Sequence, residues 1–374
     1  MQWQPTDEQS QLADALRRFI QRDYRFEQRR TLAAGDGFSP QAWATLVELG
    51  ITALLVPEAH GGLNASVQDG LHALQTLAPA LPLEPVLASA LLATRLLAAS
   101  EGRTAAQTWL PRLAAGQAIA TPAVFEPGAG FGIERPGTRA MRHADGWRLD
   151  GTKTLVLQAP VADVLLVSAC AEGATVAWFA VPATSPGVSL QPYALLDAQR
   201  AADVKLEGVQ LAADARFDPA GQGVAMGEDM HALWLAALCA EGVGLLQATL
   251  DATLAYLNTR QQFGQPIGRF QVLQHRAVDM WMELEQARSM ALLAAEICTR
   301  GEALQRRRLL AATKARVGQA CRFVSQQAVQ LHGGMGMTDE MQVSHWFKRL
   351  TIIELWLGDS DTQLQRVARG PLAA

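Results

Sequence analysis

The sequence contains few cysteines, few charged residues and no long uninterrupted apolar run. Only 4 of its 374 residues are cysteines, and they are scattered without CxxC or Cys/His spacing. This pattern is typical of reduced, mostly buried thiols and does not indicate a disulfide framework or a metal site. Charged residues make up 18% of the chain and its formal net charge is −4. The chain therefore lacks the basic surplus that is usual in nucleic-acid-binding proteins.

The sequence also lacks the pattern of a signal peptide or a membrane span. Its first residues, MQWQPTDEQSQ, include neither a cationic start nor an apolar stretch. The Leu/Ala-rich run Leu87–Ala99 contains Arg95 and is shorter than the roughly 20 residues that a span needs. It predicts a buried helix instead. We therefore expect a cytoplasmic protein without membrane contact.

Helical patterns dominate both ends of the chain. Near the start, Thr6 and Gln9 form a capping-box pattern, and Ser39-Pro40 predicts the beginning of another helix. Three long segments in the C-terminal part are dense in Ala, Leu, Gln and Arg, and they cover about 228–260, 269–300 and 303–332. Segments of this length with short breaks predict a helical bundle.

The middle of the chain follows a different pattern. From about residue 118 to residue 217 it is richer in Val and Thr. The strand candidates are Trp147–Leu149, Thr154–Leu157, Val164–Ala169, Thr175–Val181 and Val204–Leu206. Because no long helix separates them, we expect a small antiparallel barrel or sandwich and not a Rossmann sheet. The predicted class is α+β, with an N-terminal helical domain (1–117), a β domain (118–222) and a C-terminal four-helix bundle (223–374).

This order of domains, together with two motifs, resembles the acyl-CoA dehydrogenase family. The segment Thr259–Met280 is similar to the family's Arg-x-x-Phe-Gly turn, which joins two bundle helices and meets FAD across a subunit interface. The segment Gln330–Glu340 is similar to its Gln-x-x-Gly-Gly-x-Gly segment, at the family's relative spacing. The resemblance covers nearly the whole chain. It implies FAD-dependent α,β-dehydrogenation of an acyl-CoA thioester, as in fatty acid or dicarboxylic acid degradation, with electron-transfer flavoprotein as the electron acceptor.

The resemblance also implies which residues bind FAD. They are Arg260, Phe263, Gln271, Gln330, Gly333 and Gly334 in the C-terminal domain, and Leu155, Val156 and Leu157 in the β domain. An arginine offers a permanently charged fork for a pyrophosphate, and a Gly-Gly pair lets backbone N–H groups approach a phosphate closely. Alone, an arginine such as Arg260 is more often a solvated helix-end residue, and a glycine pair is an ordinary helix stop. Together and in register, the two motifs favour FAD binding.

The β domain departs from the family pattern. The family's Thr-Glu-Pro-Gly-x-Gly-Ser-Asp loop corresponds to Phe125–Gly132, in which Phe125 and Phe131 replace the Thr and the Ser. Its Gly-x-Lys-x-Trp-Ile-Thr strand, beside the flavin ring, corresponds to Gly151–Leu157. Backbone hydrogen bonds to a flavin survive such changes, whereas side-chain bonds do not. Flavin contact and a purely structural role both stay open for this loop and strand.

The usual catalytic base of the family is missing from its expected position. Counting from Gly333 places Leu357 where the family has the Glu of a Tyr-Glu-Gly-Thr segment, and the alternative base position on the first bundle helix holds Trp234. Two carboxylates are candidates instead, Asp359 and Glu241. Asp359 is alternatively a solvated or capping residue. Glu241 lies in an apolar stretch and is alternatively one half of a buried ion pair.

Four segments carry a closer likeness to the small subunits of pimeloyl-CoA dehydrogenase and related bacterial two-subunit enzymes. They are Phe26–Arg30, Val329–Thr338, Phe347–Thr351 and Gly358–Asp361. This likeness implies a subunit that binds FAD at shared interfaces while a large subunit supplies the base. Two other possibilities stay open: a self-sufficient homo-oligomeric dehydrogenase that uses Asp359 or Glu241, and a non-catalytic scaffold subunit.

Overall fold

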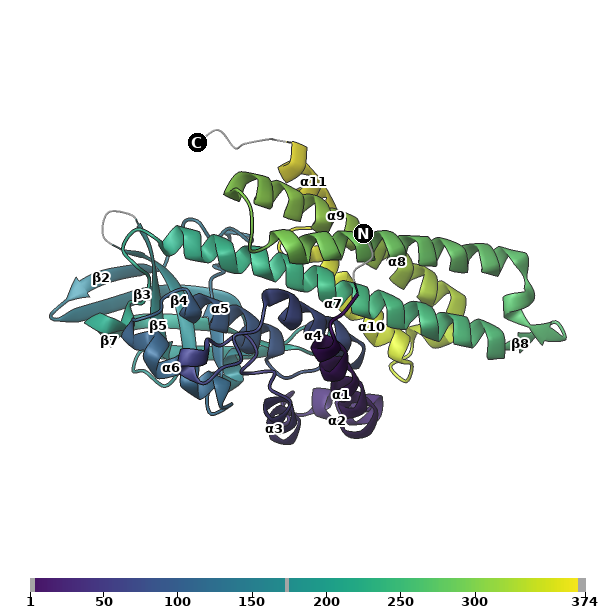
Figure 1. Ribbon diagram of the computed structural model, residues 1–374, viewed down its shortest axis with the longest axis horizontal. Coiled ribbons are helices and arrows are strands. Elements are labelled where there is room, and N and C mark those ends of the chain that lie inside the picture. The colour runs from purple at the N-terminus through teal and green to yellow at the C-terminus, as the bar shows by residue number, and fades with distance from the viewer. Residues whose placement is uncertain (1–3, 172–174, 369–374) are drawn as a thin grey trace. The chain divides into compact units, whose positions relative to one another are not determined.

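The computed structural model describes residues 4–171 and 175–368, which form two compact units (Figure 1). The helical unit contains residues 4–26, 71–82 and 234–368, and the mixed unit contains residues 27–70, 83–171 and 175–233. Helices α4 (Val67–Leu77) and α7 (Gly223–Thr259) continue from one unit into the other. The predicted α+β class and the order of helices, β domain and helices are confirmed.

Long helices make up most of the helical unit. Besides α7 it contains α1 (Asp7–Asp23), η2 (Ala78–Ala80), the hairpin β8 (Gln261–Gln262) and β9 (Gln265–Pro266), η7 (Ile267–Arg269), α8 (Gln271–Ile297), α9 (Ala303–His332), η8 (Gly333–Met337), α10 (Gln342–Leu355) and α11 (Ser360–Ala368). Helices α7, α8 and α9 match the three predicted segments to within a few residues. The predicted capping box of α1 is present, because Thr6 and Gln9 exchange side-chain-to-backbone hydrogen bonds of 3.2 and 3.0 Å.

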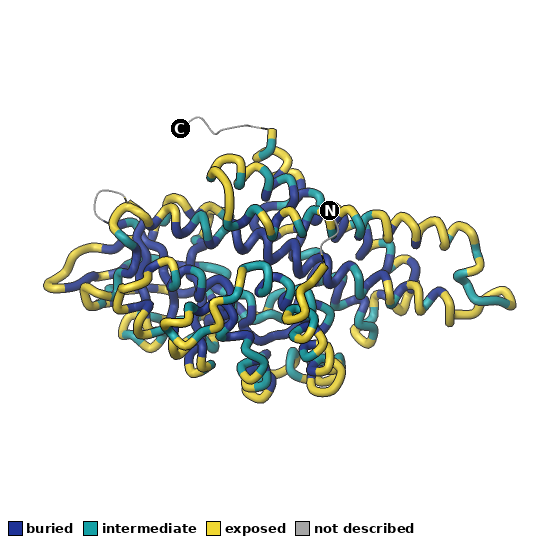
Figure 2. The backbone as a smooth tube through the Cα atoms, in the orientation of Figure 1, coloured by how far each residue is buried: buried dark blue, intermediate teal, exposed yellow. Residues whose placement is uncertain are grey.

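Two apolar helices lie in the protein interior. By length and composition α7 could cross a membrane, but 89% of its most apolar window is buried within the structure (Figure 2). Such burial is typical of the central helix of a bundle. The predicted helix at Leu87–Ala99 is a π-helix, η3 (Val86–Ala93), that continues as α5 (Thr94–Ala98) and is almost entirely buried.

The mixed unit combines short helices with one large sheet. Its helices are α2 (Phe26–Ala34), α3 (Pro40–Glu48), η1 (Glu58–His60), η3, α5, α6 (Thr104–Ala114), η4 (Ala159–Val161) and η6 (Ala213–Ala215). Its strands are β1 (Ala120–Ala123), β2 (Arg139–His143), β3 (Gly146–Leu157), β4 (Val164–Ala171), β5 (Thr175–Pro182), β6 (Val188–Ala194) and β7 (Arg200–Ala212). Ser39 caps α3 as predicted, with a hydrogen bond of 3.1 Å from Ala42 N–H to its hydroxyl.

The sheet differs from the predicted antiparallel arrangement in two pairings. Its strand order is β1-β4-β2-β3-β7-β6, with β5 paired to β4. Strands β1 and β2 pair with β4 in parallel, and the other pairings are antiparallel. Parallel neighbours need a long crossover connection, and the intervening chain supplies it. Two predicted strands, Trp147–Leu149 and Thr154–Leu157, are parts of the single strand β3, which has register shifts between Leu149 and Gly151 and between Lys153 and Val156.

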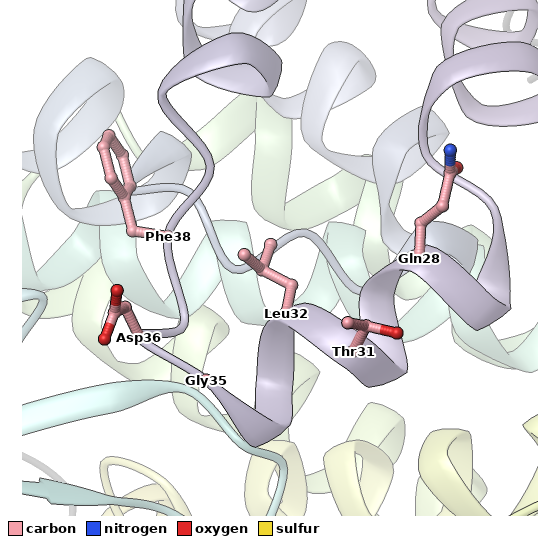
Figure 3. A pocket seen from close by; sticks show the side chains of 6 residues that line it. All are labelled: Gln28, Thr31, Leu32, Gly35, Asp36 and Phe38. Carbon is pink, nitrogen blue, oxygen red and sulfur yellow. The ribbon is translucent and has the colours of Figure 1, made fainter.

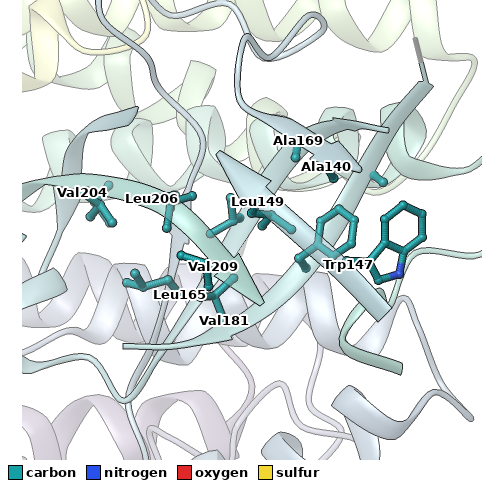
Figure 4. Packing of buried hydrophobic residues seen from close by; sticks show 14 of the residues in the cluster. Ala140, Trp147, Leu149, Leu165, Ala169, Val181, Val204, Leu206 and Val209 are labelled. Atoms are coloured by element: carbon teal, nitrogen blue, oxygen red, sulfur yellow. The ribbon is translucent and has the colours of Figure 1, made fainter. Parts of the chain in front are cut away.

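One face of this sheet carries the core of the mixed unit. Figure 4 shows buried side chains of this core, most of which come from β2, β3, β4, β5 and β7. The labelled ones are Ala140, Trp147, Leu149, Leu165, Ala169, Val181, Val204, Leu206 and Val209. Trp147 is the largest, and Arg142 covers its ring with the guanidinium 4.1 Å from the ring centroid. This packing fixes β3, the strand that carries Leu155, Val156 and Leu157.

Candidate functional site

The predicted arginine motif forms a strained hairpin at the end of α7. Arg260 N–H donates to the Tyr256 carbonyl at 2.8 Å, so Arg260 follows directly on the last helical turn. Phe263 and Gly264 have φ angles of 54° and 77°, which makes a two-residue hairpin turn of the I′ kind. A bulky residue in this region costs roughly 1–2 kcal/mol. Phe263 nevertheless stays 89% exposed and contacts the Phe270 ring edge-on at 5.9 Å. A strained and exposed aromatic side chain of this kind favours a binding role.

The predicted glycine motif ends α9 and leaves open space around its backbone. Gly333 is the C-cap of α9 with φ 62° and donates its N–H to the Gln330 carbonyl. The glycine pair is therefore a helix stop. At Gly333 and Gly334, however, a Cβ atom would find nothing within 4 Å. A ligand could approach this backbone closely, so capping and binding are compatible roles.

The two motifs lie side by side at one end of the helical unit. The Tyr256 ring, one turn before Arg260, stacks on the ring of His332, with centroids 4.5 Å apart and an interplanar angle of 26°. The Tyr256 hydroxyl also donates to the His332 carbonyl at 3.4 Å, across 76 residues of sequence. No feature of the sequence pattern pointed to this pair. It brings Arg260 and Gly333 into one local structure.

The residues around the hairpin fit the chemistry of FAD. From Ala252 to Val278 the sequence contains three arginines, one histidine and no carboxylate, which suits the two negative charges of a pyrophosphate. Among the described residues, the Arg260 guanidinium has no ion-pair partner. Gln271, the first residue of α8, and Gln330 are both exposed. A permanent cation, an exposed aromatic ring and an open Gly-Gly backbone thus meet at this end of the unit.

In the mixed unit, the predicted flavin strand contains a β-bulge at Leu155. Leu155 has φ 52°, and its N–H donates to the Tyr193 hydroxyl at 3.1 Å. Tyr193 in turn donates to Asp203 at 2.8 Å, and Thr154 donates to the same carboxylate at 2.6 Å. Burial, with the hydrogen bond to Asp203, raises the pKa of Tyr193. Val156 lies in the core, whereas Leu155 and Leu157 are half-buried and accessible to a ligand.

The loop that begins at Phe125 is closed by a buried ion pair. Glu126 accepts hydrogen bonds from Gly137 N–H and from the N–H and hydroxyl of Thr138. Lys153 Nζ donates to Glu126 at 2.6 Å, to Ser168 at 3.2 Å and to the Val124 carbonyl at 3.4 Å. The ammonium is wholly enclosed, and its three hydrogens find three acceptors. This arrangement anchors the loop at both ends.

The tip of the same loop, beyond the ion pair of Glu126 with Lys153, is exposed. Residues 127–130 are exposed, and Gly128 and Gly130 have positive φ angles with open space at their Cβ positions. Phe125 and Phe131, which replace the family's Thr and Ser, contact each other edge-on with ring centroids 5.3 Å apart. The loop therefore offers backbone groups, and the two aromatic side chains pack against one another.

Both predicted base positions in the helical unit hold apolar side chains. Leu357 is completely buried and has φ 61°. Trp356, its neighbour, lies against Trp234 with ring centroids 6.2 Å apart. The Leu357 carbonyl accepts a hydrogen bond of 2.8 Å from Gln363, and Lys314 Nζ donates to the Gly358 carbonyl at 3.2 Å. The backbone of this loop is firmly held, but neither Leu357 nor Trp234 can accept a proton.

Glu241 is committed to an ion pair. Arg349 Nε and Nη2 donate to its two oxygens at 2.7 and 2.6 Å, and the side chains are only 8% and 7% exposed. The alternative that the sequence left open, a buried ion pair, is therefore the observed arrangement. The pair lies two helical turns from the contact of Trp234 with Trp356, in the register of two antiparallel helices. It fixes α7 against α10.

Asp359 is a helix cap. Its carboxylate accepts the N–H of Thr362 at 2.8 Å, at the beginning of α11. Hydrogen bonds from Thr362 lower its pKa below the usual value. A carboxylate with a lowered pKa is a weaker base. Of the alternatives that the sequence left open for Asp359, the capping role is the observed one.

We expect Arg260→Ala to weaken FAD affinity by roughly 10- to 100-fold, because a charge-assisted hydrogen bond contributes about 1.5–3 kcal/mol. Titration of the full chain with FAD, followed by flavin fluorescence, measures this directly. Arg300→Ala is the matched control, since Arg300 is exposed and paired with Glu296 on the helix surface. Equal dissociation constants for the two variants would exclude Arg260 from the FAD site.

A shallow hollow lies elsewhere in the mixed unit (Figure 3). It has a volume of about 410 Å³ and is lined by Gln28, Thr31, Leu32, Gly35, Asp36 and Phe38. None of these residues belongs to the predicted site. The hollow is wide open, and its lining mixes unrelated chemistry without a buried polar group, so it does not indicate a particular ligand.

Known proteins are similar to this chain along its whole length. Residues 6–117, 122–209 and 232–372 match the models described as the N-terminal, middle and C-terminal domains of acyl-CoA dehydrogenase. Acyl-CoA dehydrogenase IpdE2 of Mycolicibacterium smegmatis is 31% identical, over 88% of this chain and 88% of its own length. Acyl-CoA dehydrogenase FadE27 of Mycobacterium tuberculosis is 30% identical, over 89% and 88%. A chain of the solved ChsE4–ChsE5 complex from Mycobacterium tuberculosis is 27% identical with a TM-score of 0.86, over 99% of this chain and 98% of that one.

Proposed function

This chain belongs to the acyl-CoA dehydrogenase family, and we propose that it works as one subunit of a two-component enzyme whose partner supplies the catalytic base. As a member of the family it is an FAD-dependent oxidoreductase that acts on the CH–CH bond of an acyl-CoA thioester. The limits 1–117, 118–222 and 223–374 for its domains are part of the proposal. So is the closer likeness to the small subunits of pimeloyl-CoA dehydrogenase.

The observation that carries the proposal is that three carboxylates near the predicted base positions, Glu241, Glu354 and Asp359, already accept hydrogen bonds within the chain. Glu241 is paired with Arg349, Asp359 caps α11, and Glu354 accepts from Arg322 and from the N–H of Ser360. Leu357 and Trp234 occupy the predicted base positions themselves. Removal of the α proton needs a carboxylate that can reach the substrate and accept a proton. A partner subunit is the simplest source of that group.

The residues of this chain would bind and orient the cofactor. Arg260 would neutralise the pyrophosphate, Phe263 would cover a ring, and the backbone of Gly333 and Gly334 would approach a phosphate or ribose. Gln271 and Gln330 would add hydrogen bonds, and the strand at Leu155, Val156 and Leu157 would lie beside the flavin with backbone groups only. FAD, when bound, supplies the acceptor for the hydride that leaves the β carbon.

The two C-terminal motifs, residues 260–271 and 330–337, together form the proposed cofactor arm. The exposure of this cofactor arm supports an oligomer. Phe263, Met335 and Met337 are large apolar side chains that are 89%, 46% and 72% exposed at the end of the helical unit. Exposed apolar groups that gather around a binding motif are typical of an interface. The similarity to a chain of the ChsE4–ChsE5 complex supports a partner of a different sequence. We propose acyl-CoA as substrate, electron-transfer flavoprotein as electron acceptor and the cytoplasm as location.

Anaerobic flavin reduction tests the proposal. The purified chain with FAD is expected to show no bleaching with a panel of acyl-CoA esters, and bleaching is expected once a large subunit is added. Bleaching by the chain alone would contradict the need for a partner, and its loss in Asp359→Asn or Glu241→Gln would identify a self-sufficient enzyme. A chain that binds no flavin in either state would instead be the scaffold subunit.

The role of Asp359 gives a separate prediction. We expect Asp359→Ala to lower the free energy of unfolding by about 1 kcal/mol, because the α11 cap is lost, and Asp359→Asn to change it by only a few tenths, because Asn caps equally well. Denaturant unfolding measures both. The Asn variant is also expected to keep flavin reduction in the two-component enzyme within about threefold of wild type, since hydrogen bonds already lower the pKa of Asp359. A loss of reduction without a loss of stability would make Asp359 the base after all.

A further inference from the structure

A single aromatic contact links the two halves of the cofactor arm. Tyr256 lies one turn before Arg260 on α7, and His332 is the residue directly before Gly333 on α9. Their rings are stacked at 4.5 Å with an angle of 26° between the planes. Contacts of this geometry contribute beyond the apolar area that they bury. The ends of two long helices, each carrying one binding motif, are held together here.

Each partner of the contact is also fixed to its own motif. The Nδ1 atom of His332 lies 2.8 Å from the Ala328 carbonyl, which can only accept, so Nδ1 carries the proton and the ring orientation is set. Burial lowers the pKa of His332 and so disfavours the charged form of its ring. The Tyr256 carbonyl accepts the N–H of Arg260 at 2.8 Å, and the Tyr256 hydroxyl donates to the His332 carbonyl, which adjoins Gly333. Tyr256 is thus joined to Arg260 by a backbone hydrogen bond, and His332 is joined to Gly333 by a peptide bond.

We propose that Tyr256 and His332 are positioning residues that set the distance between Arg260 and the Gly333–Gly334 backbone, so that one FAD molecule engages both motifs. The proposal rests on the proposed function only in taking FAD as the ligand of the arm. Helix ends open more readily than helix centres. Without the stack, the two ends would have to be ordered when the cofactor binds, and that ordering would weaken affinity. Neither ring needs to touch FAD for this effect.

Substitutions at Tyr256 separate the contribution of ring stacking to FAD affinity from the contribution of the hydroxyl. In FAD titrations of the full chain, followed by flavin fluorescence, Tyr256→Phe keeps the stack and is expected to bind within about twofold of wild type. Tyr256→Leu loses the stack and is expected to bind roughly 3- to 10-fold more weakly, as the typical strength of an aromatic pair implies. Leu250→Ala is the matched control, because Leu250 is buried on the same helix, six positions before Tyr256. It destabilises α7 without touching the stack, and its FAD affinity is expected to stay at the wild-type value.

A double-mutant cycle with Arg260→Ala tests the route of the effect. If Tyr256 acts by placing Arg260, Tyr256→Leu is expected to have a clearly smaller effect on affinity in the Arg260→Ala background than in wild type. Equal effects in both backgrounds, wild-type affinity in Tyr256→Leu, or equal weakening in Leu250→Ala would each overturn the positioning role. Failure of the wild-type chain to bind FAD would be a different result, because it would overturn the proposed cofactor arm itself and the positioning role with it.

Discussion

Arg349→Met is expected to lower the free energy of unfolding of the helical unit by about 3–5 kcal/mol, because it leaves the Glu241 carboxylate enclosed without its cation. Arg349 now supplies both hydrogen bonds to that carboxylate, at 2.7 and 2.6 Å. The Glu241 side chain is 8% exposed, so water cannot replace them. Denaturant unfolding followed by tryptophan fluorescence measures the loss, since Trp234 and Trp356 lie in the same unit.

The double variant Glu241→Leu/Arg349→Met is expected to recover most of this stability. Replacing a buried ion pair by apolar side chains of similar size is often neutral, whereas removing one partner is not. Arg300→Met provides the control at an exposed pair with Glu296, where the loss should stay below about 1 kcal/mol. If Arg349→Met lowered the free energy of unfolding by no more than Arg300→Met, the ion pair of Glu241 would not be needed for stability. Glu241 would then return as a candidate base, and the two-component proposal would lose part of its support.

The parts of the fold that the sequence predicted depend on local chemistry. The caps at Thr6 and Ser39 are such cases, since the accepting hydroxyl and the donating N–H lie three residues apart. The long helices follow from apolar spacing over many turns. Strands β1, β2 and β6 were missed. Strand β1 contains Pro122 and is buried throughout, and four of the five residues of β2 are exposed. Strand β6 alternates only at its start and then contains Pro192, which weakens a strand pattern.

The parts of the site that the sequence could not predict are contacts between distant residues. Glu241 and Arg349 are 108 positions apart. The sequence therefore indicated a buried carboxylate that needs a cationic partner, but it did not show which cation. The stack of Tyr256 on His332 has no local signature either. Strain is equally hidden, because the residue types at Phe263, Leu155 and Leu357 do not indicate the positive φ angles that these positions adopt. Motif spacing predicted the cofactor arm, and only the three-dimensional structure shows the contacts between its two motifs.

Between about pH 8 and pH 10.5, the wild-type protein is expected to gain stability relative to Lys153→Met, by up to about 3 kcal/mol. Burial lowers the pKa of Lys153 from 10.5 to about 8, although the charge of Glu126 acts in the opposite direction. In this window the unfolded chain still binds the proton and the folded chain does not, so stability rises with pH. For Glu126, burial would raise the pKa, but the charge of Lys153 and hydrogen bonds lower it. The stability that Glu126 contributes is lost only in acid, outside this window.

Denaturant unfolding of the wild type and of Lys153→Met across this pH range shows how the ion pair of Lys153 with Glu126 stabilises the 126–138 loop. Lys314, whose pKa is also lowered by burial, is present in both and cancels in the comparison. Lys205→Met, at the exposed pair with Glu207, should show no such trend. If the attraction to Glu126 outweighed the cost of burying the ammonium, the wild type would instead lose stability as the pH rises. That opposite slope would mean that the charge of Lys153 holds the loop in place, whereas the expected slope means that its shape and hydrogen bonds do so against an electrostatic cost.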